Sequence, residues 1–408
     1  MKKILALIMA LVMAVGLVAC GGNKAPAPSN TPADPGTSEN TPALPTAERK
    51  GGKILFCSSV TDGPQYEAYV AYLDEILGKM GYTWELVIGD PSNDPAGNLA
   101  AVQNAMTNNV VGFITAQDGG LAEIMAEYPD MYVVGFMTDM AGVFGEDGTS
   151  AACLNNDHFL GTVGDQYISG ADLGKLYFDA VVEKGYHKVS TVTFPPFAFP
   201  NLMVADVTFR GLVEEYNKTA SQPIEVVGDV EVLMFAPLSD AYFMDPAHQD
   251  LDAVVAPIAG CSFVYPAMKA AMDAGTISAD TKLLTSGFDS DDSLLADFGG
   301  DGVIQSIVIG GVESMIWPVV MLDNAIQGKM PADYAGPEQV DSAIFLIDSR
   351  EDMDKVVSRS LLYTGDASNI VADWSTVQSF LTTYNESASY AALKDYLASD
   401  ALTVDGLK

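Results

Sequence analysis

The chain has 408 residues, with 54 acidic and 20 basic side chains, so its formal net charge is −34. A field of that sign repels phosphate, which argues against nucleic acid or an anionic lipid surface as a partner. Hydrophobic residues make up 49% of the chain. That content supports large cores, and the length exceeds what one compact core usually holds, which predicts two lobes.

The first twenty residues have the pattern of a secretory signal. Lys2 and Lys3 precede an apolar run over residues 4–18, and the sequence Leu-Val-Ala leads directly to Cys20. This arrangement resembles the lipobox of a bacterial lipoprotein. It implies cleavage before Cys20, diacylation of its sulfur, and a lipid anchor on the outer face of the cell membrane. The alternatives are an ordinary signal peptide with an incidental cysteine, or a single transmembrane anchor, for which the run is short.

Residues 21–50 are predicted to be a disordered linker. They contain six prolines among Ser, Thr, Asn and Ala residues, and no aromatic residue. Such a segment cannot bury enough apolar surface to offset its ordering entropy, so it acts as a spacer. Beyond it, Cys57, Cys153 and Cys261 each lie in an apolar run and form neither a disulfide framework nor a metal site. Buried free thiols are expected, with one disulfide pair as the alternative.

After the linker, short apolar strands alternate with helices, which predicts an α/β body. The apolar runs are continuous rather than alternating, as in parallel sheets that are covered on both faces. The first predicted strands span residues 53–59, 83–88, 110–115, 132–136 and 150–154. The helices between them are predicted over residues 66–80, after Asn93-Asp94-Pro95, and over 121–128.

The same pattern then restarts. Strands are predicted over residues 188–194, 224–230, 253–257, 283–287 and 303–309, and helices over 172–184, 209–216, 265–274, near Leu294 and over 312–327. Two successive doubly wound lobes predict a cleft where the carboxyl ends of their strands face each other, because ligands of open α/β sheets bind there. After Asp348, helical signals at 374–384 and 390–398 predict a helical extension packed on one lobe.

Eight segments stand in a characteristic order. They are KILFCSS (53–59), GYTWELVIGDPSNDP (81–95), VVGFITAQDGG (110–120), YVVGFMTDM (132–140), GKLYFDAVVEKG (174–185), FRGLVEEY (209–216), LDAVVAPIAG (251–260) and LLTSGFD (283–289). The ordered set resembles the type I periplasmic-binding-protein family, whose ribose-binding branch serves ABC importers. The resemblance covers residues 53 to about 345. It implies two doubly wound parallel-sheet lobes joined by three hinge crossings, near 155–168, 309–312 and 338–345.

The resemblance also implies a domain organisation and a function. The signal spans residues 1–20 and the linker 21–50; the N-terminal lobe comprises 51–160 and 311–340, the C-terminal lobe 161–310, and the last hinge crossing with the helical extension 341–408. The implied function is that of a monomeric solute-binding lipoprotein that delivers a small molecule to the permease of an ABC importer. A ligand-sensing subunit that presents its closed form to a membrane receptor is the alternative.

Several positions depart from the family's sugar-binding pattern. Asp139 matches an Asp-Arg pair of the family, but Met140 replaces the arginine. Thr208 stands where a second arginine is usual, Gly260-Cys261 replaces an Asn-Asp pair, and Ile309 stands at a hinge glutamine. A standard hexose or pentose site is therefore not expected.

The predicted binding residues are those that keep the pattern or lie in a loop that enters the cleft. They are Asp62, Gln65, Tyr66, Asp139, Phe197 and Asp289. For the aspartates a capping or turn role is the alternative, and for Phe197 packing within its own loop. Arg210 is the only arginine within the two lobes. Because bidentate recognition of carboxylate and phosphate depends on arginine, a neutral or cationic ligand is expected. The resemblance implies that this ligand is sugar-like or nucleoside-like.

Catalysis has little support in the sequence. The histidines, His158, His187 and His248, are scattered, and neither a G-x-S-x-G elbow nor a phosphate-binding glycine loop occurs. No catalytic residue, metal or cofactor is expected. A secreted enzyme on the same scaffold is the remaining alternative.

Overall fold

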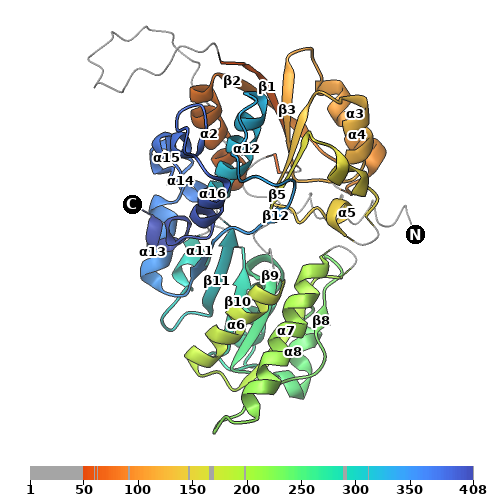
Figure 1. Ribbon diagram of the computed structural model, residues 1–408. Coiled ribbons are helices and arrows are strands. Elements are labelled where there is room, and N and C mark those ends of the chain that lie inside the picture. Colours follow the sequence, from red (N-terminus) through yellow and green to blue (C-terminus); the bar gives the residue numbers. More distant parts are fainter. Residues whose placement is uncertain are drawn as a thin grey trace, which may run out of the picture. The chain divides into compact units, whose positions relative to one another are not determined.

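The computed structural model describes residues 49–58, 60–61, 63–90, 92–145, 148–164, 170–196, 199–287, 292–310 and 312–407. The predicted signal with Cys20, and the linker up to residue 48, lie outside this range. Contacts divide the chain into a large body, Arg49–Leu233 with Pro237–Lys408, and a second unit, Met1–Glu48 with Met234–Ala236. Of the second unit, the described residues are Met234–Ala236, which form a bend. Every helix and strand labelled in Figure 1 belongs to the large body.

The first sheet has six strands in the order β12-β5-β4-β3-β1-β2, and all of its pairings are parallel. Its strands are β1 (Gly52–Ser58), β2 (Tyr82–Ile88), β3 (Val110–Thr115), β4 (Tyr132–Phe136), β5 (Phe159–Val163) and β12 (Gln339–Val340). The helices that connect them are α2 (Gly63–Met80), α3 (Pro95–Ala105), α4 (Leu121–Glu127), α5 (Ala141–Phe144) and the 3-10 helix η1 (Ala151–Asn155). Helix α3 begins where predicted, because Asp94 caps it by accepting a 3.0 Å hydrogen bond from the Gly97 N–H.

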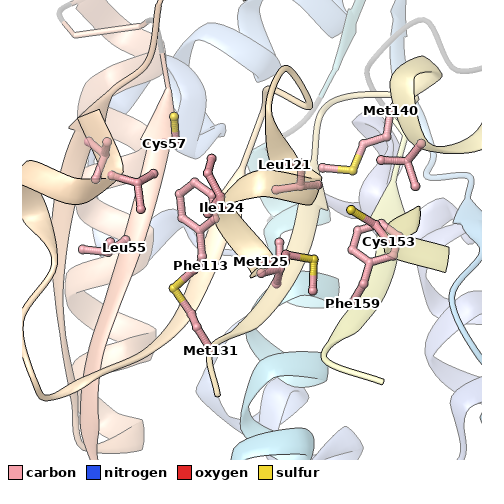
Figure 2. Packing of buried hydrophobic residues seen from close by; sticks show 14 residues of the cluster. Leu55, Cys57, Phe113, Leu121, Ile124, Met125, Met131, Met140, Cys153 and Phe159 are labelled. Atoms are coloured by element: carbon pink, nitrogen blue, oxygen red, sulfur yellow. The ribbon is translucent and has the colours of Figure 1, made fainter. Parts of the chain in front are cut away.

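Both faces of the first sheet are covered. On one face, Leu55 of β1 and Phe113 of β3 lie in one buried cluster with Ile124 of α4, as Figure 2 shows. Val102 of α3 belongs to the same cluster. On the other, Phe56 lies edge-on to the Tyr69 ring of α2, with 5.2 Å between the ring centroids. Coverage of both faces explains why the strands are continuous apolar runs.

The three cysteines of the body are free and buried, as predicted. Cys57 and Cys153 belong to the hydrophobic cluster of the first sheet. Burial raises the pKa of each of these two thiols to about 11. Both are therefore neutral packing groups at physiological pH.

The strand predicted at residues 150–154 is wrong. Residues Ala151–Asn155 form the 3-10 helix η1, in which Cys153 alone is buried. The fifth strand of the sheet is β5, Phe159–Val163, and all five of its residues are buried. The short apolar run at 150–154 cannot by itself distinguish one helical turn from a strand, and burial on every side favours the later segment.

The second sheet has seven strands in the order β13-β11-β10-β9-β6-β7, with β8 paired to β6. Its strands are β6 (Lys188–Thr193), β7 (Glu225–Val226), β8 (Glu231–Val232), β9 (Ala253–Ala259), β10 (Lys282–Ser286), β11 (Ile304–Gly310) and β13 (Ile344–Ile347). Its helices are α6 (Gly170–Lys184), α7 (Pro200–Asn217), α8 (Ala241–Met244), α9 (Gly260–Phe263), α10 (Tyr265–Asp273) and α11 (Asp292–Ala296), and the 3-10 helix η2 spans Pro246–His248. The pairings are parallel except that of β13 with β11, which is antiparallel.

Two elements of the second sheet differ in length from their predictions. The strand predicted at 224–230 is only β7, two residues long. Helix α7 starts at Pro200, well before the predicted Phe209, with the proline at its first turn. It packs closely on α6, where a Cβ atom on Gly174 would lie 2.4 Å from the Ala205 carbonyl oxygen.

The chain passes between the two sheets from β5 to α6, from β11 through η3 (Val312–Met315) to α12 (Ile316–Ile326), and from β12 to β13. Helix α12 contacts β3, β4 and β5, so it covers the first sheet although it follows the second. Two doubly wound sheets with repeated passages between them confirm the predicted fold class. No helix in the described residues is long and apolar enough to cross a bilayer.

The C-terminal extension comprises α13 (Arg350–Arg359), α14 (Leu361–Thr364), α15 (Trp374–Phe380), α16 (Tyr390–Leu397) and the 3-10 helices η4 (Ala367–Asn369), η5 (Asp400–Leu402) and η6 (Val404–Gly406). Helices α14 and α15 contact α2, beside the first sheet, whereas η6 contacts α13 and the strand β13 of the second sheet. The expectation that the extension packs on one lobe is therefore wrong. After β13 the chain runs from the second sheet to the first, where α14 and α15 pack on α2, and its last turn, η6, packs on β13 of the second sheet.

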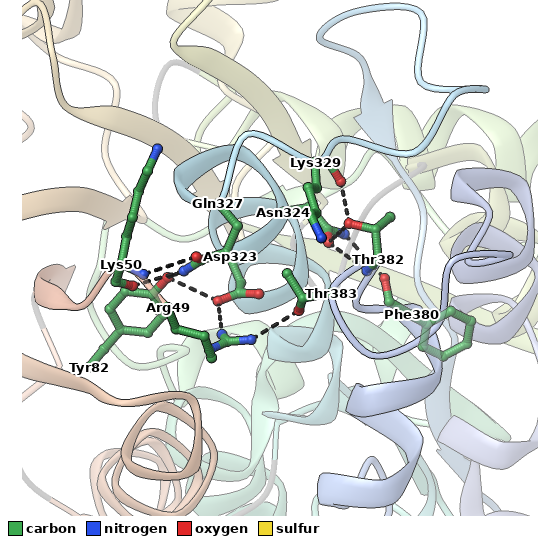
Figure 3. A network of polar contacts seen from close by, with 10 residues as sticks. All are labelled: Arg49, Lys50, Tyr82, Asp323, Asn324, Gln327, Lys329, Phe380, Thr382 and Thr383. Atoms are coloured by element: carbon green, nitrogen blue, oxygen red, sulfur yellow. Dashed lines mark hydrogen bonds and ion pairs between the residues drawn. The ribbon is translucent and has the colours of Figure 1, made fainter. Parts of the chain in front are cut away.

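The last residues of the predicted linker are bound to the body. Arg49 forms an ion pair with Asp323 of α12 and donates to the Thr383 hydroxyl at 2.9 Å, as drawn in Figure 3. The backbone of Lys50 makes two hydrogen bonds with the amide of Gln327, at 2.8 and 3.0 Å. These contacts fix the point at which the folded body begins.

Candidate functional site

A cavity of about 240 Å³ lies at the carboxyl ends of strands β9, β10 and β11 of the second sheet. Residues at the start of α2, which follows β1 of the first sheet, and residues of α14 complete its wall. The lining residues are Pro64, Gln65, Ala259, Cys261, Ser262, Gly287, Ile309, Gly310, Leu362 and Tyr363. Parallel α/β sheets bind ligands at this end of their strands, so this cavity is the candidate site.

A buried threonine shapes the wall that comes from β9. The Thr285 hydroxyl donates to the Ile258 carbonyl at 2.7 Å and accepts from the Gly260 N–H at 2.8 Å. A Cβ atom on Gly260 would lie 2.3 Å from that hydroxyl oxygen. Glycine at this position is therefore required by close packing, and the next two residues, Cys261 and Ser262, line the cavity.

Gln65 is the predicted binding residue that lines the cavity. Its amide nitrogen donates to the Tyr69 hydroxyl at 2.7 Å and lies 3.7 Å from the Met137 sulfur. Tyr69 is buried, and burial raises its pKa above the ordinary value, so it stays a neutral phenol. These contacts fix the glutamine side chain, and its amide oxygen is available as a hydrogen-bond acceptor.

The other predicted residues have different placements. Tyr66 is half-buried in α2 and is not part of the cavity wall. Asp139 accepts a 3.0 Å hydrogen bond from the Ala141 N–H, so its carboxylate forms a turn before α5. Its carbonyl oxygen also accepts a hydrogen bond from the Gln339 side chain at 2.6 Å.

Three predicted ligand contacts lie outside the described residues: Asp62, Phe197 and Asp289. Gly287, which comes shortly before Asp289 in the chain, is part of the cavity wall. Gly63, which follows Asp62, begins α2. The described neighbours of these two aspartates thus belong to elements that line the cavity.

Several lining residues are not among the predicted contacts. Ile309 and Cys261 stand where the family has polar contacts, and the structure makes both part of the wall. Leu362 and Tyr363 were not predicted, because they lie beyond residue 345, where the resemblance ends. Nothing in the local pattern of the extension indicates a ligand contact.

No charged side chain is found among the lining residues that the structure describes. Glu313 of η3 lies three residues after the lining residue Gly310 and is buried. Burial raises the pKa of Glu313 to about 7, and a hydrogen bond from the Val371 backbone N–H partly offsets this shift. Groups of three or more metal-ligating side chains do not occur within the described part of the chain.

Solved structures of transporter proteins have a fold similar to that of this chain. The periplasmic ribose ABC transporter protein of Conexibacter woesei is 17% identical, with a TM-score of 0.55 over 76% of this chain and 96% of its own. The sugar-binding protein of a Bacillus halodurans ABC transporter is 19% identical, with a TM-score of 0.52 over 74% of this chain and 99% of its own. This chain has the type I periplasmic-binding-protein fold. The resemblance seen in the sequence is thereby confirmed at the level of the fold.

A third similar structure covers more of the chain. The 5-methylthioribose transporter solute-binding protein of Thermotoga lettingae, in complex with 5-methylthioribose, is 16% identical, with a TM-score of 0.50 over 87% of this chain and 100% of its own. No protein-family model matches the sequence, and no curated protein matches it.

Proposed function

We propose that this protein is an extracytoplasmic solute-binding lipoprotein that captures a small neutral or cationic molecule between two lobes and delivers it to an ABC importer. The observation that carries the proposal is the cavity itself. Its wall combines the carboxyl ends of β9, β10 and β11 of the second sheet with the start of α2. Helix α2 connects β1 and β2 of the first sheet. A ligand held there would touch elements of both sheets.

The composition of the wall supports an uncharged ligand. Gln65 and Ser262 bring an amide and a hydroxyl to the wall. Such groups recognise hydroxyls by neutral hydrogen bonds, as a sugar or a nucleoside requires. Asp62 and Asp289 remain proposed contacts, which would extend the range to cationic ligands.

The similar solved structures support the same class of function. They are described as a ribose transporter, a sugar transporter and a 5-methylthioribose transporter protein. The first two are described as proteins of ABC transporters, and the third as a solute-binding protein of a transporter. Repeated passages of the chain between the sheets would let the two lobes close, with the ligand favouring the closed state.

A binding screen tests this function. Thermal unfolding of the mature protein is followed with sugars, nucleosides, polyamines and amino acids, and calorimetry measures the affinity of each compound that raises Tm. We expect a sugar or nucleoside to bind, and small-angle scattering to show a smaller radius of gyration with it. A phosphate or dicarboxylate as the tightest ligand would contradict the argument from side-chain charge, and a saturating ligand without compaction would contradict closure.

The lipid anchor needs a separate experiment. Replacing Cys20 by alanine removes the thiol that the lipid would modify, so the variant should move from the detergent phase to the soluble fraction or the medium. Ser29→Ala, a change in the same predicted linker region, serves as the control and should stay in the detergent phase. Equal partitioning of the Cys20 variant and the wild type would overturn the lipoprotein assignment and leave the solute-binding proposal intact.

A further inference from the structure

The C-terminal extension reaches the candidate site. Leu362 and Tyr363 of α14 line the cavity, together with Pro64 and Gln65 of α2. The two helices pack on each other, and α14 also packs on α13. One wall of the cavity therefore comes from a segment that follows both doubly wound sheets in the chain.

Helix α14 is held in a defined position. The Thr364 hydroxyl donates to the Ser360 carbonyl at 2.8 Å and accepts from the Asn369 amide at 2.9 Å. Gly365 ends the helix in the left-handed conformation, with φ of +58°, and its N–H donates to the Leu361 carbonyl. Leu361, the first residue of the helix, is fully buried. A wall that is anchored in this way selects ligands by shape, because it cannot yield to a poor fit.

The walls of the cavity differ in polarity. Leu362, the Tyr363 ring and Ile309 contribute apolar surface, whereas Gln65 and Ser262 contribute polar groups. Aromatic rings and aliphatic side chains pack against the apolar parts of a ligand, and the polar groups orient its hydroxyls. The fitting ligand is therefore a small neutral molecule that carries both hydroxyls and apolar surface.

We propose that α14 is part of the ligand-binding site, and that Leu362 and Tyr363 select hydroxylated ligands that bear an apolar group over fully polar ones. This inference rests on the proposed solute-binding function and adds a determinant of specificity to it. It assigns the C-terminal extension a direct role in recognition.

A set of related probes tests the selectivity. Ribose, 5-deoxyribose and adenosine share the 2- and 3-hydroxyls of the ribose ring and differ in apolar surface. Calorimetry with the wild type should show weaker binding of ribose than of at least one of the two less polar probes. Tyr363→Ala should weaken the tightest of these by about tenfold, the loss expected for one aromatic contact, and bring its affinity closer to that of ribose.

Matched variants separate recognition from folding. Tyr363→Phe keeps the ring and should retain the wild-type preference, and Leu362→Ala should lower it in the same direction as Tyr363→Ala. Tyr128→Ala and Leu154→Ala, which remove a tyrosine and a leucine outside the cavity wall, should leave affinity unchanged. Thermal unfolding of every variant without ligand identifies any that lose the fold. Tyr363→Trp, which fills the cavity instead of emptying it, should exclude adenosine before ribose.

The outcomes distinguish the two proposals. If Gln65→Ala weakens binding while Leu362→Ala and Tyr363→Ala leave affinity and preference within about twofold, solute binding stands and the role of α14 is wrong. A wild-type preference for ribose over both less polar probes also overturns the role of α14. If the wild type binds none of the screened solutes, both proposals fail.

Discussion

The cavity wall and helix α12, which packs on the first sheet, differ in the charged side chains that they contain. The described cavity wall has no charged side chain, although the chain carries a net charge of −34. Helix α12 and the preceding η3, in contrast, bury Asp323 and Glu313. Asp323 accepts from Arg49 and from the Tyr82 hydroxyl, and Glu313 accepts from the Val371 N–H.

The difference shows what buried charge does in this protein. Arg49 lies where the body begins, so Asp323 binds the start of the body to α12 (Figure 3). Val371 lies in the C-terminal extension, so Glu313 binds that extension to η3. An uncharged wall leaves the cavity suited to a neutral ligand. Substitutions in the two regions should therefore have different effects. Those near α12 should change the free energy of unfolding, and those in the cavity should change ligand affinity.

The largest expected effect is that of Asp323→Ala. The change leaves the Arg49 guanidinium, three-quarters buried, without its carboxylate and removes the acceptor of the Tyr82 hydroxyl. Breaking a buried ion pair in this way should lower the free energy of unfolding by roughly 3–5 kcal/mol, measured by urea denaturation. Asp354→Ala, which breaks the exposed pair with Arg350, is the matched control and should cost at most about 1 kcal/mol. Equal losses would mean that the buried pair does not hold the start of the body.

Glu313 should make stability depend on pH. The folded protein keeps the carboxyl proton up to about pH 7, whereas an ordinary glutamate releases it near 4.5. Between these values this carboxyl binds fewer protons in the unfolded chain than in the folded one, so the contribution of Glu313 to stability is greatest below pH 4.5 and falls as pH rises to 7. The loss should reach roughly 3 kcal/mol.

Glu313→Gln tests this pH dependence because glutamine does not titrate. The difference in unfolding free energy between the variant and the wild type should shift in favour of the variant as pH rises from 4.5 to 7, in urea titrations at several pH values. Glu386→Gln, a change at an exposed glutamate, serves as the control. Parallel curves for Glu313→Gln and the wild type would show that folding leaves the pKa of Glu313 unchanged.

Gln65→Ala should change affinity and leave stability nearly unchanged. The variant loses a neutral hydrogen bond to the ligand, which is worth about 1 kcal/mol or roughly a fivefold change in Kd. Gln103→Ala is the control, because Gln103 is an exposed glutamine of α3 that donates to the Glu127 carboxylate and is not part of the cavity wall. If both variants bind with the wild-type affinity, the cavity at α2 is not the ligand site.

Asp139→Ala should have the smallest effect. Its carboxylate accepts from the Ala141 N–H, so the change should cost at most about 1 kcal/mol of stability, through loss of one turn contact. Affinity for a neutral ligand should stay within about twofold. A tenfold loss of affinity in calorimetry would place Asp139 at the ligand, as the resemblance to sugar binders implies. The ligand site would then contain a charged side chain, and the comparison with the buried acids of η3 and α12 would fail.

Local sequence pattern is enough to predict the two α/β repeats and most of their elements. Strands β3 (Val110–Thr115) and β4 (Tyr132–Phe136) have the predicted bounds, because a strand buried on both faces must be a continuous apolar run. Helix α2 ends at Met80, directly before Gly81, whose φ of +87° favours glycine. Such features depend on neighbours in the chain, so they can be predicted from local pattern.

Tertiary structure alone decided the features that depend on distant partners. Residues 151–155 form a helical turn because β5 takes the place beside β4, and β13 runs antiparallel because it pairs with β11. The same holds for α14, whose leucine and tyrosine line a cavity built from residues about 300 positions earlier and about 50 to 100 positions earlier in the chain. A local pattern carries no information on which surface a short amphipathic helix will cover, because that choice follows from the packing of the completed sheets.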